Sequence, residues 1–449
     1  MQDRVRWLAA FRRLVTAARD ELCDLIGQEV HKPYFEALTA DVLPLLAAVR
    51  WHERYGPGVL KPRGAAGKPW FMVGQRARLT QQPLGTVAII ATWNYPVQLL
   101  GIQLVQAVCA GNRVIVKPSE RAPRTQGRLM ELALAAAADV KLGEGVIEVR
   151  PATRAAGAAL LEDHTSGKVK LDHVVFTGST AVGRRIAAWA AEQLVSTTLE
   201  LSGCDSALVM ADADPVLAAR SIWHAATTNG GQTCMAPRRA LVDAAVYQRF
   251  AREMGTLAAA ARPRRLIDAA AAARCVELAQ EAVRGGARPA SGLLELPSAA
   301  DPAVLRPMAM LDCPAASQAV RGEHFGPLLA VVPTGGLEAM LAIHRRCGQH
   351  LSVCVYTRDA KGAAERIAPL LGASQVNIND SLIPTAIPDT AIAGHGESGW
   401  GASRGRAGLL GLSRPVAVSR TSTRIRTPLE EPDAKFVKRF SGIVGWMFR

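Results

Sequence analysis

The sequence predicts an α/β protein in which open, mainly parallel β-sheets are covered by helices. From residue 86 onward, short apolar segments rich in Val and Ile alternate with segments of helical length, and this alternation restarts after Glu200. Strands that alternate with helices form parallel sheets through right-handed crossovers. The chain has 449 residues, of which 49% are hydrophobic and 20% charged. That is enough for roughly two or three domains with large cores, and it excludes a mainly disordered chain or a small disulfide-stapled domain.

Residues 1–50 are expected to form two amphipathic helices. In the first, apolar residues recur every three or four positions over Trp7–Ile26, and Gly27 is a typical helix stop. The second shows the same spacing over Tyr34–Val49. The Gly- and Pro-rich stretch Pro57–Pro69 is typical of a connection.

Two α/β units are expected to follow. In the first, Pro96 suits the first turn of a helix that ends at Gly111. The other elements expected in this unit are strands at Thr86–Ala91, Arg113–Lys117, Gly145–Val149 and Val174–Thr177, with helices at about Thr125–Ala138 and Ala181–Gln193. The second unit, roughly Ser206–Thr390, is expected to contain helices around Ala258–Ala261 and Ala269–Ala273, and strands at Leu328–Val332 and Leu351–Tyr356.

Two further segments are typical of edge strands of a smaller sheet, Ala77–Gln81 and the alternating Val416–Arg426. The tail Lys435–Arg449 mixes cations with Phe, Ile, Val and Trp. We favour the interpretation that this tail packs on a partner subunit or on its own domain. The alternative is that it lies weakly in a membrane interface, since one short anchor binds membranes only weakly.

The composition indicates the cell compartment of the protein and excludes some classes of partner. The net charge of +14 is dispersed along the chain, aromatic residues are only 5%, and no nucleic-acid-binding motif is present, so a nucleic-acid partner is not expected. Eight scattered cysteines without a CxxC pair indicate a reduced, cytoplasmic protein. The nine histidines show no metal-ligand spacing, so no metal is expected. The N-terminus opens with charges and shows no secretory signal.

The segment Asn229–Cys234 (NGGQTC) is the first candidate for chemistry. Its two glycines let the backbone approach a ligand closely, and a thiolate at Cys234 can attack a carbonyl carbon if its pKa is lowered. A lone cysteine is otherwise usually a small core residue, but the polar, Gly-rich setting argues against a core.

Glu200 is the second candidate, because it ends an otherwise apolar run (TLELSG). Desolvation there raises the pKa of a carboxyl group, which suits a general base near neutral pH. The alternative is a strand-end glutamate paired with an arginine.

Asn94, in TWNYP, lies between a predicted strand and a helix start, at the sheet edge where ligands bind. Its amide can stabilise an oxyanion, or it can simply cap the helix.

Three weaker motifs would suit a dinucleotide. Gly178 and Ser179 lie in FTGSTAVG, a strand–turn–helix segment where backbone N–H groups can face a phosphate. Lys117 and Glu120 (KPSE) follow a neighbouring strand and can grip ribose hydroxyls, or form a solvated loop. Glu323 and Phe325 lie in GEHFGP, which alone means little.

In this order, the motifs resemble those of the aldehyde dehydrogenase superfamily, over about residues 5–430. TWNYP, KPSE, FTGSTAVG, LELSG, NGGQTC, GEHFGP and the late SGWG occur in the family's order, with the family's spacing between Glu200 and Cys234 and between Asn94 and Lys117. The short N-terminal region resembles the class 3 branch, whose members oxidise fatty and medium- to long-chain aldehydes and in some cases attach to membranes by the C-terminus.

The resemblance implies a Rossmann-like NAD(P)-binding domain at 1–205 with an oligomerisation strand at about 70–84. It implies a catalytic α/β domain at 206–390, and a return over 391–449 with a second oligomerisation strand at about 415–427. It therefore implies a homodimer, although a tetramer stays open.

The resemblance also implies roles for the site residues. Cys234 would be the nucleophile, Asn94 and the Cys234 backbone N–H the oxyanion hole, and Glu200 the base that activates water. The cofactor would be bound by the remaining candidates: Lys117 and Glu120 on the adenosine ribose, Gly178 and Ser179 near the pyrophosphate, and Glu323 with Phe325 at the nicotinamide ribose. Glu120 should repel a 2′-phosphate, so NAD is preferred, with NADP as the second cofactor.

Several positions depart from the family pattern. Ser202 and Cys204 replace the usual residues of LELGGK, Ala181 replaces a glutamate, and His324 replaces an isoleucine. Thr227 and Ile392 lie near positions where family members contact substrate. These changes leave the aldehyde open among fatty, terpenoid or carotenoid, and aromatic classes. A CoA-acylating or reductive enzyme, and a non-catalytic scaffold that retains the fold, are the alternative functions.

Overall fold

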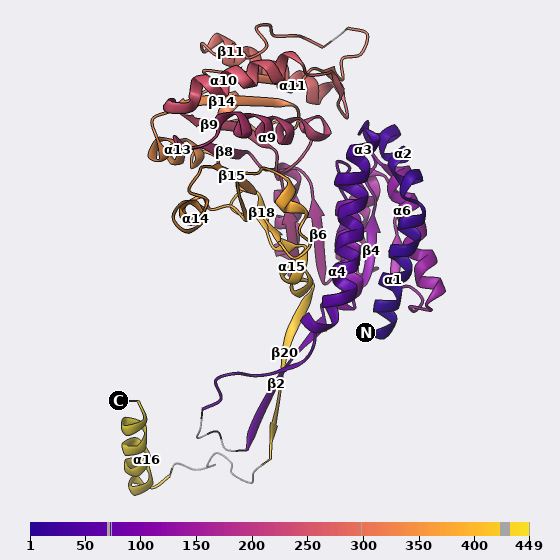
Figure 1. Ribbon diagram of the computed structural model, residues 1–449. Helices are drawn as coiled ribbons and strands as arrows, with labels where there is room; N and C mark the ends of the chain where they lie inside the picture. Colours follow the sequence, from indigo (N-terminus) through magenta and orange to yellow (C-terminus); the bar gives the residue numbers. More distant parts are fainter. Residues whose placement is uncertain (70–71, 73, 298, 423–431, 449) are drawn as a thin grey trace. The chain divides into compact units, whose positions relative to one another are not determined.

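The computed structural model describes residues 1–69, 72, 74–297, 299–422 and 432–448. The chain divides into two compact units, each described by itself below (Figure 1). The larger unit comprises Met1–Leu60 and Gln82–Arg414, and the smaller comprises Lys61–Gln81 and Pro415–Arg449.

Four helical segments open the larger unit, rather than the two helices predicted: α1 (Gln2–Ala17), α2 (Arg19–Val30), α3 (Tyr34–Ala37) and, after a π-helical turn, α4 (Leu43–Val59). The first predicted helix is interrupted at Ala18 and passes through Gly27, so Gly27 is not its end; the left-handed His31 (φ 60°) ends it instead. The predicted connection at Pro57 was also wrong at its start, because Pro57 lies in the last turn of α4. A proline there removes a single helical hydrogen bond, which the packed helix tolerates.

A six-stranded sheet forms the core of the N-terminal half, in the order β18-β7-β6-β3-β4-β5. Its strands are β3 (Thr86–Ile90), β4 (Arg113–Lys117), β5 (Ile147–Val149), β6 (His173–Thr177), β7 (Ser196–Glu200) and β18 (Gly399–Trp400). All neighbouring pairs are parallel except the antiparallel β18–β7 pair. The predicted strands of this sheet are therefore present, with ends that differ by one or two residues.

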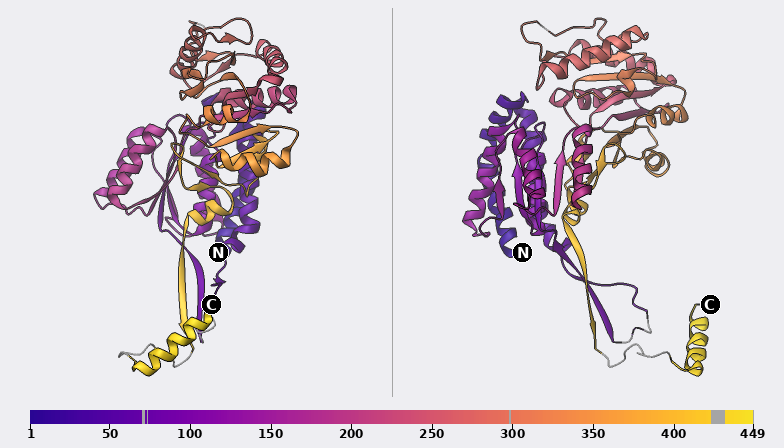
Figure 2. Two further views of the ribbon diagram at one scale, coloured as in Figure 1. Left: turned by 90° about the vertical axis from the view of Figure 1, so that its left-hand side faces the viewer. Right: turned by 180° about the vertical axis from the view of Figure 1, so that it is seen from behind.

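Helices cover both faces of this sheet, as Figure 2 shows. One face packs on α1, α4, α5 (Gln98–Ala110) and α6 (Pro123–Asp139) through a large apolar cluster that includes Val87, Val114 and Val116. The other face packs on α7 (Arg154–Thr165) and α8 (Thr180–Gln193). Helix α5 ends at the left-handed Gly111 (φ 99°), as predicted. Helix α7 was not predicted.

A seven-stranded sheet follows, in the order β11-β13-β14-β9-β8-β15-β16. Its strands are β8 (Asp205–Val209), β9 (Pro237–Asp243), β11 (Arg288–Pro289), β13 (Met308–Leu311), β14 (Leu328–Thr334), β15 (Ser352–Tyr356) and β16 (Gln375–Ile378). Helices α9 (Pro215–Thr227) and α10 (Ala244–Ala259) pack on one face, and α11 (Ala269–Arg284), α12 (Gln318–Arg321) and α13 (Leu337–His344) pack on the other. The two Ala-rich runs are thus helical, although the first only up to Ala259.

Shorter elements complete the larger unit. They are the strand pairs β10 (Arg264–Arg265) with β12 (Val304–Leu305) and β17 (Ile392–Ala393) with β19 (Ala402–Ser403), the helical turn α14 (Ala360–Gly362), and helix α15 (Gly405–Gly411).

The smaller unit is a three-stranded sheet, β1-β2-β20, followed by one helix. It contains β1 (Arg63–Gly64), β2 (Gln75–Pro83), β20 (Ser413–Thr421) and α16 (Ala434–Met447), with β2 and β20 reaching just into the larger unit. Both predicted edge strands are present, but 423–426 of the second, with parts of the 70–84 and 415–427 segments, lie outside the described residues. The domain boundaries at 205 and 390 stay a prediction.

Among the described residues, no helix is long and apolar enough to cross a bilayer.

Candidate active site

A pocket of about 210 Å³ opens at the carboxyl ends of β3, β6 and β7. It is lined by twelve residues, seven of which are predicted site residues: Asn94, Gly178, Ser179, Glu200, Cys234, Glu323 and Phe325. These residues come from stretches far apart in sequence, and the parallel pairing of β3, β6 and β7 brings three of the stretches to one sheet edge. The structure therefore gathers most of the predicted site into a single cavity.

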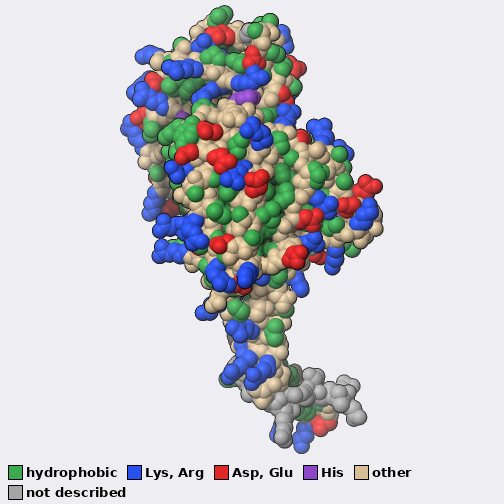
Figure 3. All heavy atoms as spheres, turned by 90° about the vertical axis from the view of Figure 1, so that its right-hand side faces the viewer, with side chains coloured by type: hydrophobic (Ala, Val, Ile, Leu, Met, Phe, Trp, Pro, Cys, Tyr) green, Lys and Arg blue, Asp and Glu red, His purple; other side chains and the backbone are tan. Residues whose placement is uncertain are grey.

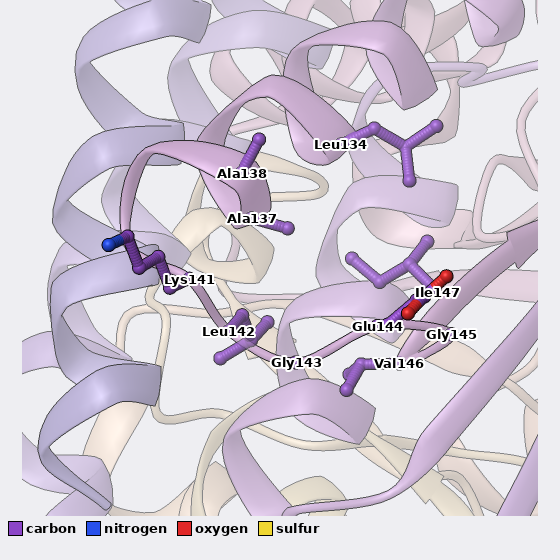
Figure 4. Close-up of a pocket in the computed structure, with 10 residues that line it drawn as sticks. All are labelled: Leu134, Ala137, Ala138, Lys141, Leu142, Gly143, Glu144, Gly145, Val146 and Ile147. Carbon is purple, nitrogen blue, oxygen red and sulfur yellow. The ribbon is translucent and has the colours of Figure 1, made fainter.

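A second hollow, of about 360 Å³, is larger but chemically poor (Figure 4). It lies between the end of α6 and the turn that leads into β5, and its lining is mostly Leu, Ala, Val, Ile and Gly, with Lys141 and Glu144 as its charged members. Because it holds no nucleophile and no predicted site residue, the smaller pocket is the better candidate for chemistry.

Cys234 differs from the other cysteines by its exposure. The other seven are buried, whereas Cys234 is only half-buried and lines the pocket. Burial, together with the negative charges of Glu200 and Asp205, raises the pKa of the Cys234 thiol to about 12, against the opposing effect of Arg404 and Arg238. At neutral pH the resting group is therefore a thiol, and it must lose its proton when it attacks.

Glu200 is the last residue of β7 and is almost fully buried (3% exposed). Its Oε2 accepts a hydrogen bond from the Ser403 hydroxyl (3.1 Å), and its Oε1 has no partner among the described residues. Burial raises the pKa of Glu200, and the nearby Arg404 and the Ser403 hydroxyl limit that rise. The outcome is a buried carboxyl group with one unpartnered oxygen in the pocket lining.

The SGWG segment holds Glu200 from one side. Gly399 pairs with Glu200 across β18 and β7, and it adopts φ 96°. A Cβ atom there would lie 2.1 Å from the Leu199 carbonyl oxygen, so only glycine allows this approach.

Asn94 lies in the loop between β3 and α5, as predicted, but it does not cap the helix. The N–H groups of Val97 and Gln98 at the start of α5 bond instead to Asp41 Oδ1 (3.1 and 2.8 Å). The Asn94 amide donates one hydrogen bond to the Gln232 carbonyl (3.0 Å) and its oxygen accepts one from Thr92 (3.1 Å). A primary amide has a second N–H, which stays available for a ligand.

Gly178 and Ser179 lie where β6 meets α8, and Ser179 caps that helix. Glu323 and Phe325 also line the pocket, and the Phe325 ring meets Trp93 edge-on, with ring centroids 5.8 Å apart. Glu323 Oε2 accepts a hydrogen bond from Gln349 (3.3 Å).

Lys117 and Glu120 are not pocket-lining residues. They lie at and just after the carboxyl end of β4, the neighbour of β3, and form an ion pair of 2.7 Å. Partial burial alone would raise the pKa of Glu120, but the hydrogen bond from Lys117, a backbone hydrogen bond and the charges of Lys117 and Arg154 together outweigh it, and the pKa is lowered. Arg154 Nε lies 3.8 Å from the same carboxylate.

Comparison with known families agrees with this geometry. The sequence model described as "Aldehyde dehydrogenase family" matches residues 1–418. The chain belongs to the aldehyde dehydrogenase family. The resemblance inferred from the motifs is thereby confirmed, and the chain is an oxidoreductase that acts on aldehydes.

Relatives and solved structures cover nearly the whole aldehyde dehydrogenase chain. A "4,4'-diapolycopene aldehyde oxidase" of Methylomonas sp is 28% identical over 99% of this chain and 83% of the relative. An "Aldehyde dehydrogenase family 3 member A2" of Mus musculus is 28% identical over 90% of this chain and 81% of the relative. The solved NAD+ complex of an aldehyde dehydrogenase from Bacillus cereus is 23% identical, with a TM-score of 0.85 over 94% of this chain and 84% of that chain. The last likeness confirms the predicted fold.

A buried ion pair behind the pocket was missed by the sequence analysis. Lys32 and Asp41 are both fully buried and are bonded to each other. Lys32 also donates to the Asn94 carbonyl (3.0 Å) and lies over the Tyr95 ring (3.8 Å to its centroid). Burial lowers the pKa of Lys32 and raises that of Asp41, and each charge opposes the shift of the other. The pair fixes the loop that carries Asn94.

Arg404 was also missed. It is buried, donates to the Thr385 carbonyl, and follows Ser403, which bonds Glu200. Its guanidinium lowers the pKa of both Glu200 and Cys234, against their larger burial effects.

Replacing Lys32 with Met should lower the free energy of unfolding by roughly 3–5 kcal/mol, because the Asp41 carboxylate would stay buried without its partner. Urea unfolding at neutral pH measures this. The matched control is Arg113→Met, which breaks an exposed pair with Glu148 and should lower stability by about 1 kcal/mol or less. Equal losses in the two variants would show that the Lys32 pair does not support the fold in this way.

Proposed function

We propose that this aldehyde dehydrogenase oxidises an apolar aldehyde to its carboxylic acid with NAD(P), through a thiohemiacetal and a thioester on Cys234. The observation that carries the proposal is the presence of Cys234, Glu200 and Asn94 in one pocket. A nucleophile, a base and an oxyanion donor are the groups that such a reaction needs within reach of one carbonyl carbon.

The residues around the pocket fit a dinucleotide. The N-terminus of α8, a helix of 14 residues, opens beside Gly178 and Ser179 at a parallel-sheet edge, which suits a pyrophosphate. Lys117 and Glu120 would hold the adenosine ribose, and Glu323 with Phe325 would hold the nicotinamide ribose. When bound, NAD(P) supplies the acceptor for the hydride.

Acylation begins when the Cys234 sulfur adds to the aldehyde carbon and the thiol proton is lost. The negative charge that develops on the aldehyde oxygen would be stabilised by the free N–H of Asn94 and by the backbone N–H of Cys234, which donates to no described residue. After the hydride has left, the substrate is bound to Cys234 as a thioester.

Deacylation requires a water molecule at the thioester carbon. Glu200 has one unpartnered carboxylate oxygen and a raised pKa, so it can take a proton from water and release the acid. This base is the reason to favour hydrolysis over a CoA-acylating reaction, in which a thiol would replace water. It also argues against a non-catalytic scaffold.

The apolar class of substrate is supported by the surroundings of Cys234. Its side chain packs with Met235, Leu351, Leu382 and Ile392 in a small apolar cluster. The Methylomonas relative is named for a diapolycopene aldehyde.

For the cofactor, we propose NAD over NADP because the ionised Glu120 repels a 2′-phosphate. The nearby Arg154 and Lys117 weaken that repulsion enough for NADP to serve as well.

Purified enzyme should form NADH from a chain-length series of aldehydes, with kcat/KM rising from short to long chains, since each buried CH₂ contributes about 0.8 kcal/mol. NAD and NADP are compared in parallel by absorbance.

Cys234→Ala should abolish turnover and keep cofactor binding, whereas Cys275→Ala, at a buried cysteine outside the pocket, should retain activity. Full activity of Cys234→Ala would refute the proposal.

Glu200→Gln should slow deacylation more than acylation, because the amide cannot accept the proton of water. A burst of NADH followed by slow turnover is expected in rapid-mixing experiments. In the wild type, kcat should fall as the pH drops through the raised pKa of Glu200, because the protonated carboxyl is not a base, and this acid limb should be absent in the variant. A missing burst, with no thioester formed, would show that Glu200 acts on Cys234 rather than on water.

We also propose a homodimer. Strands β2 and β20 belong to a sheet of only three strands, and exposed sheet edges need a partner or protection. Light scattering that gave the mass of one chain would contradict this proposal.

The sequence alone favours packing of the tail on protein, but no residue of α16 is buried on its own chain, and we propose the alternative, that this helix contacts an anionic membrane surface weakly. Its apolar residues recur on one face, none of its residues is buried, and Phe440 is 54% exposed. The smaller unit has twelve Lys and Arg against three Asp and Glu, a net +9 of the chain's +14. Basic side chains lie along the β2–β20 ladder in Figure 3. An amphipathic helix beside a basic segment is typical of interfacial binding to anionic lipid.

Phe440→Asp should lower binding to phosphatidylserine-containing vesicles roughly tenfold or more, because the apolar face loses a buried side chain. Gly442→Asp adds the same charge on the polar face, where an added Cβ atom meets nothing within 4 Å, and should have a much smaller effect. Sedimentation with vesicles measures both variants. Equal losses would indicate purely electrostatic attraction, and a change of oligomeric mass in Phe440→Asp would indicate that α16 packs on a second copy instead.

A further inference from the structure

We infer that Arg238 is a positioning residue that sets the oxyanion hole by holding the peptide bond that precedes Cys234. This inference rests on the proposed function, because it concerns the group that stabilises the oxyanion formed on the carbonyl oxygen of the substrate. The evidence is a set of hydrogen bonds from one buried guanidinium to the backbone of two loops.

Arg238 lies near the start of β9 and is 1% exposed. Its Nη2 donates to the Thr233 carbonyl (2.8 Å), and its Nη1 donates to the carbonyls of Gly231 (2.7 Å) and Gly326 (3.2 Å). The guanidinium also lies 5.6 Å from the centroid of the Phe325 ring. One side chain therefore binds the nucleophile loop and the GEHFGP loop together.

The Thr233 carbonyl and the Cys234 N–H belong to the same peptide group. All described peptide bonds are trans, so this carbonyl and this N–H point in opposite directions. Arg238 does not line the pocket, whereas Cys234 does. A guanidinium that holds the carbonyl from behind therefore leaves the N–H facing the other way, where the oxyanion forms.

The rest of the loop leaves this peptide little freedom. The carbonyl of Gln232, between the two that Arg238 holds, accepts from Asn94 (3.0 Å) and Asn229 (3.1 Å). A Cβ atom at Gly231, where φ is 70°, would lie 2.4 Å from the backbone of Gly326, so the two loops are in direct contact. Three successive carbonyls are thus fixed, two of them by Arg238.

The charge of Arg238 adds to its geometric role. A donor bonded to a peptide carbonyl polarises that peptide and strengthens hydrogen bonding by its N–H. A cation does this more strongly than a neutral donor, because charge-assisted hydrogen bonds are the stronger ones. Arg238 would therefore both aim the Cys234 N–H and strengthen it as a donor.

The neighbouring residue offers a matched control. Arg239 is equally buried, and its guanidinium also holds backbone carbonyls, those of Cys204 (3.0 Å) and Val320 (2.7 Å), together with the Ser206 hydroxyl (2.6 Å). Successive residues of a strand point to opposite faces, and Arg239 touches no carbonyl of the nucleophile loop. Removing either guanidinium should disturb folding similarly, but only Arg238 should affect the oxyanion.

Two reactions of Cys234 separate the oxyanion from the thiolate. With p-nitrophenyl acetate, the thiolate adds to the carbonyl carbon through an oxyanion, the C–O bond breaks, and nitrophenolate leaves behind an acetyl thioester. With iodoacetamide, the thiolate displaces iodide and no oxyanion forms. Both reactions depend on the thiolate fraction in the same way, so their rate ratio at one pH isolates the oxyanion hole. Neither needs a cofactor or the natural aldehyde.

Arg238→Met should lower the ratio of acylation to alkylation by roughly 10²–10³-fold, the loss typical of one oxyanion-hole donor. Arg238→Lys, which keeps the charge but holds fewer carbonyls, should recover part of that loss. Arg239→Met should keep the ratio within about twofold of the wild type. Mass spectrometry of the labelled peptide, with Cys234→Ala as the blank, confirms the site of reaction.

An unchanged ratio in folded Arg238→Met would overturn the inference, as would an equal fall in Arg239→Met. If Arg238→Met does not fold, Arg238→Lys decides alone: a ratio equal to that of the wild type overturns the inference, and a roughly tenfold fall supports it. A wild-type protein that is acylated at Cys234 but reduces neither NAD nor NADP with any aldehyde would refute the proposed function and leave this test intact.

Discussion

The geometry of the active site depends on hydrogen bonds to the peptide groups of one buried loop, residues 228–233. Residues 228–233 are all buried, and an unpaired peptide group there would destabilise the fold as much as a lost hydrogen bond. The loop makes some of these hydrogen bonds itself, for example between the Gln232 N–H and the Asn229 carbonyl (3.1 Å), and side chains from three other elements supply others. Asn94 comes from the loop after β3, Arg238 from β9, and Glu36 of α3 accepts from the Asn229 N–H (2.8 Å). The position of the nucleophile follows from these contacts.

The same constraint explains why charged groups lie so deep in this protein. A lone buried charge is strongly unfavourable, so each one here is paired or surrounded by dipoles. Lys32 is matched by Asp41, and the carboxylate of Glu200 is faced by Arg404 and the Ser403 hydroxyl. Burial, followed by the negative charges of Glu200 and Asp205, raises the pKa of Cys234 to about 12. At neutral pH the resting Cys234 is therefore a thiol.

Sequence reasoning succeeded for the fold, because the alternation of strands and helices predicted the sheets. Motifs at strand ends placed Asn94 and Glu200 at one sheet edge, since the carboxyl ends of parallel strands meet. The pocket contains both residues together with Cys234, which precedes β9, and their catalytic roles stay a prediction. It failed where the burial of a charge has no local pattern. Lys32 bonds Asp41 nine positions away and Asn94 62 positions away, and Arg238 bonds Thr233 five positions away and Gly326 88 positions away, so in the sequence each resembles a solvated charge. Helix α7 was missed because Leu160 is its only buried residue, and the break at Ala18 has no local signal, since alanine favours helices.

The two adjacent arginines of β9 show how one strand can serve two purposes. The two-residue period of a strand directs Arg238 toward the nucleophile loop and Arg239 toward the carbonyls of Cys204 and Val320. Arg239 Nη1 also lies 3.5 Å from the Cys204 sulfur, at a position where the family pattern has a lysine. The guanidinium of Arg239, from the neighbouring strand, thus lies against the residue that stands at the lysine's position in the motif. The strand's period thus gives two adjacent buried cations different backbone partners, and only one of them holds the loop that carries the nucleophile.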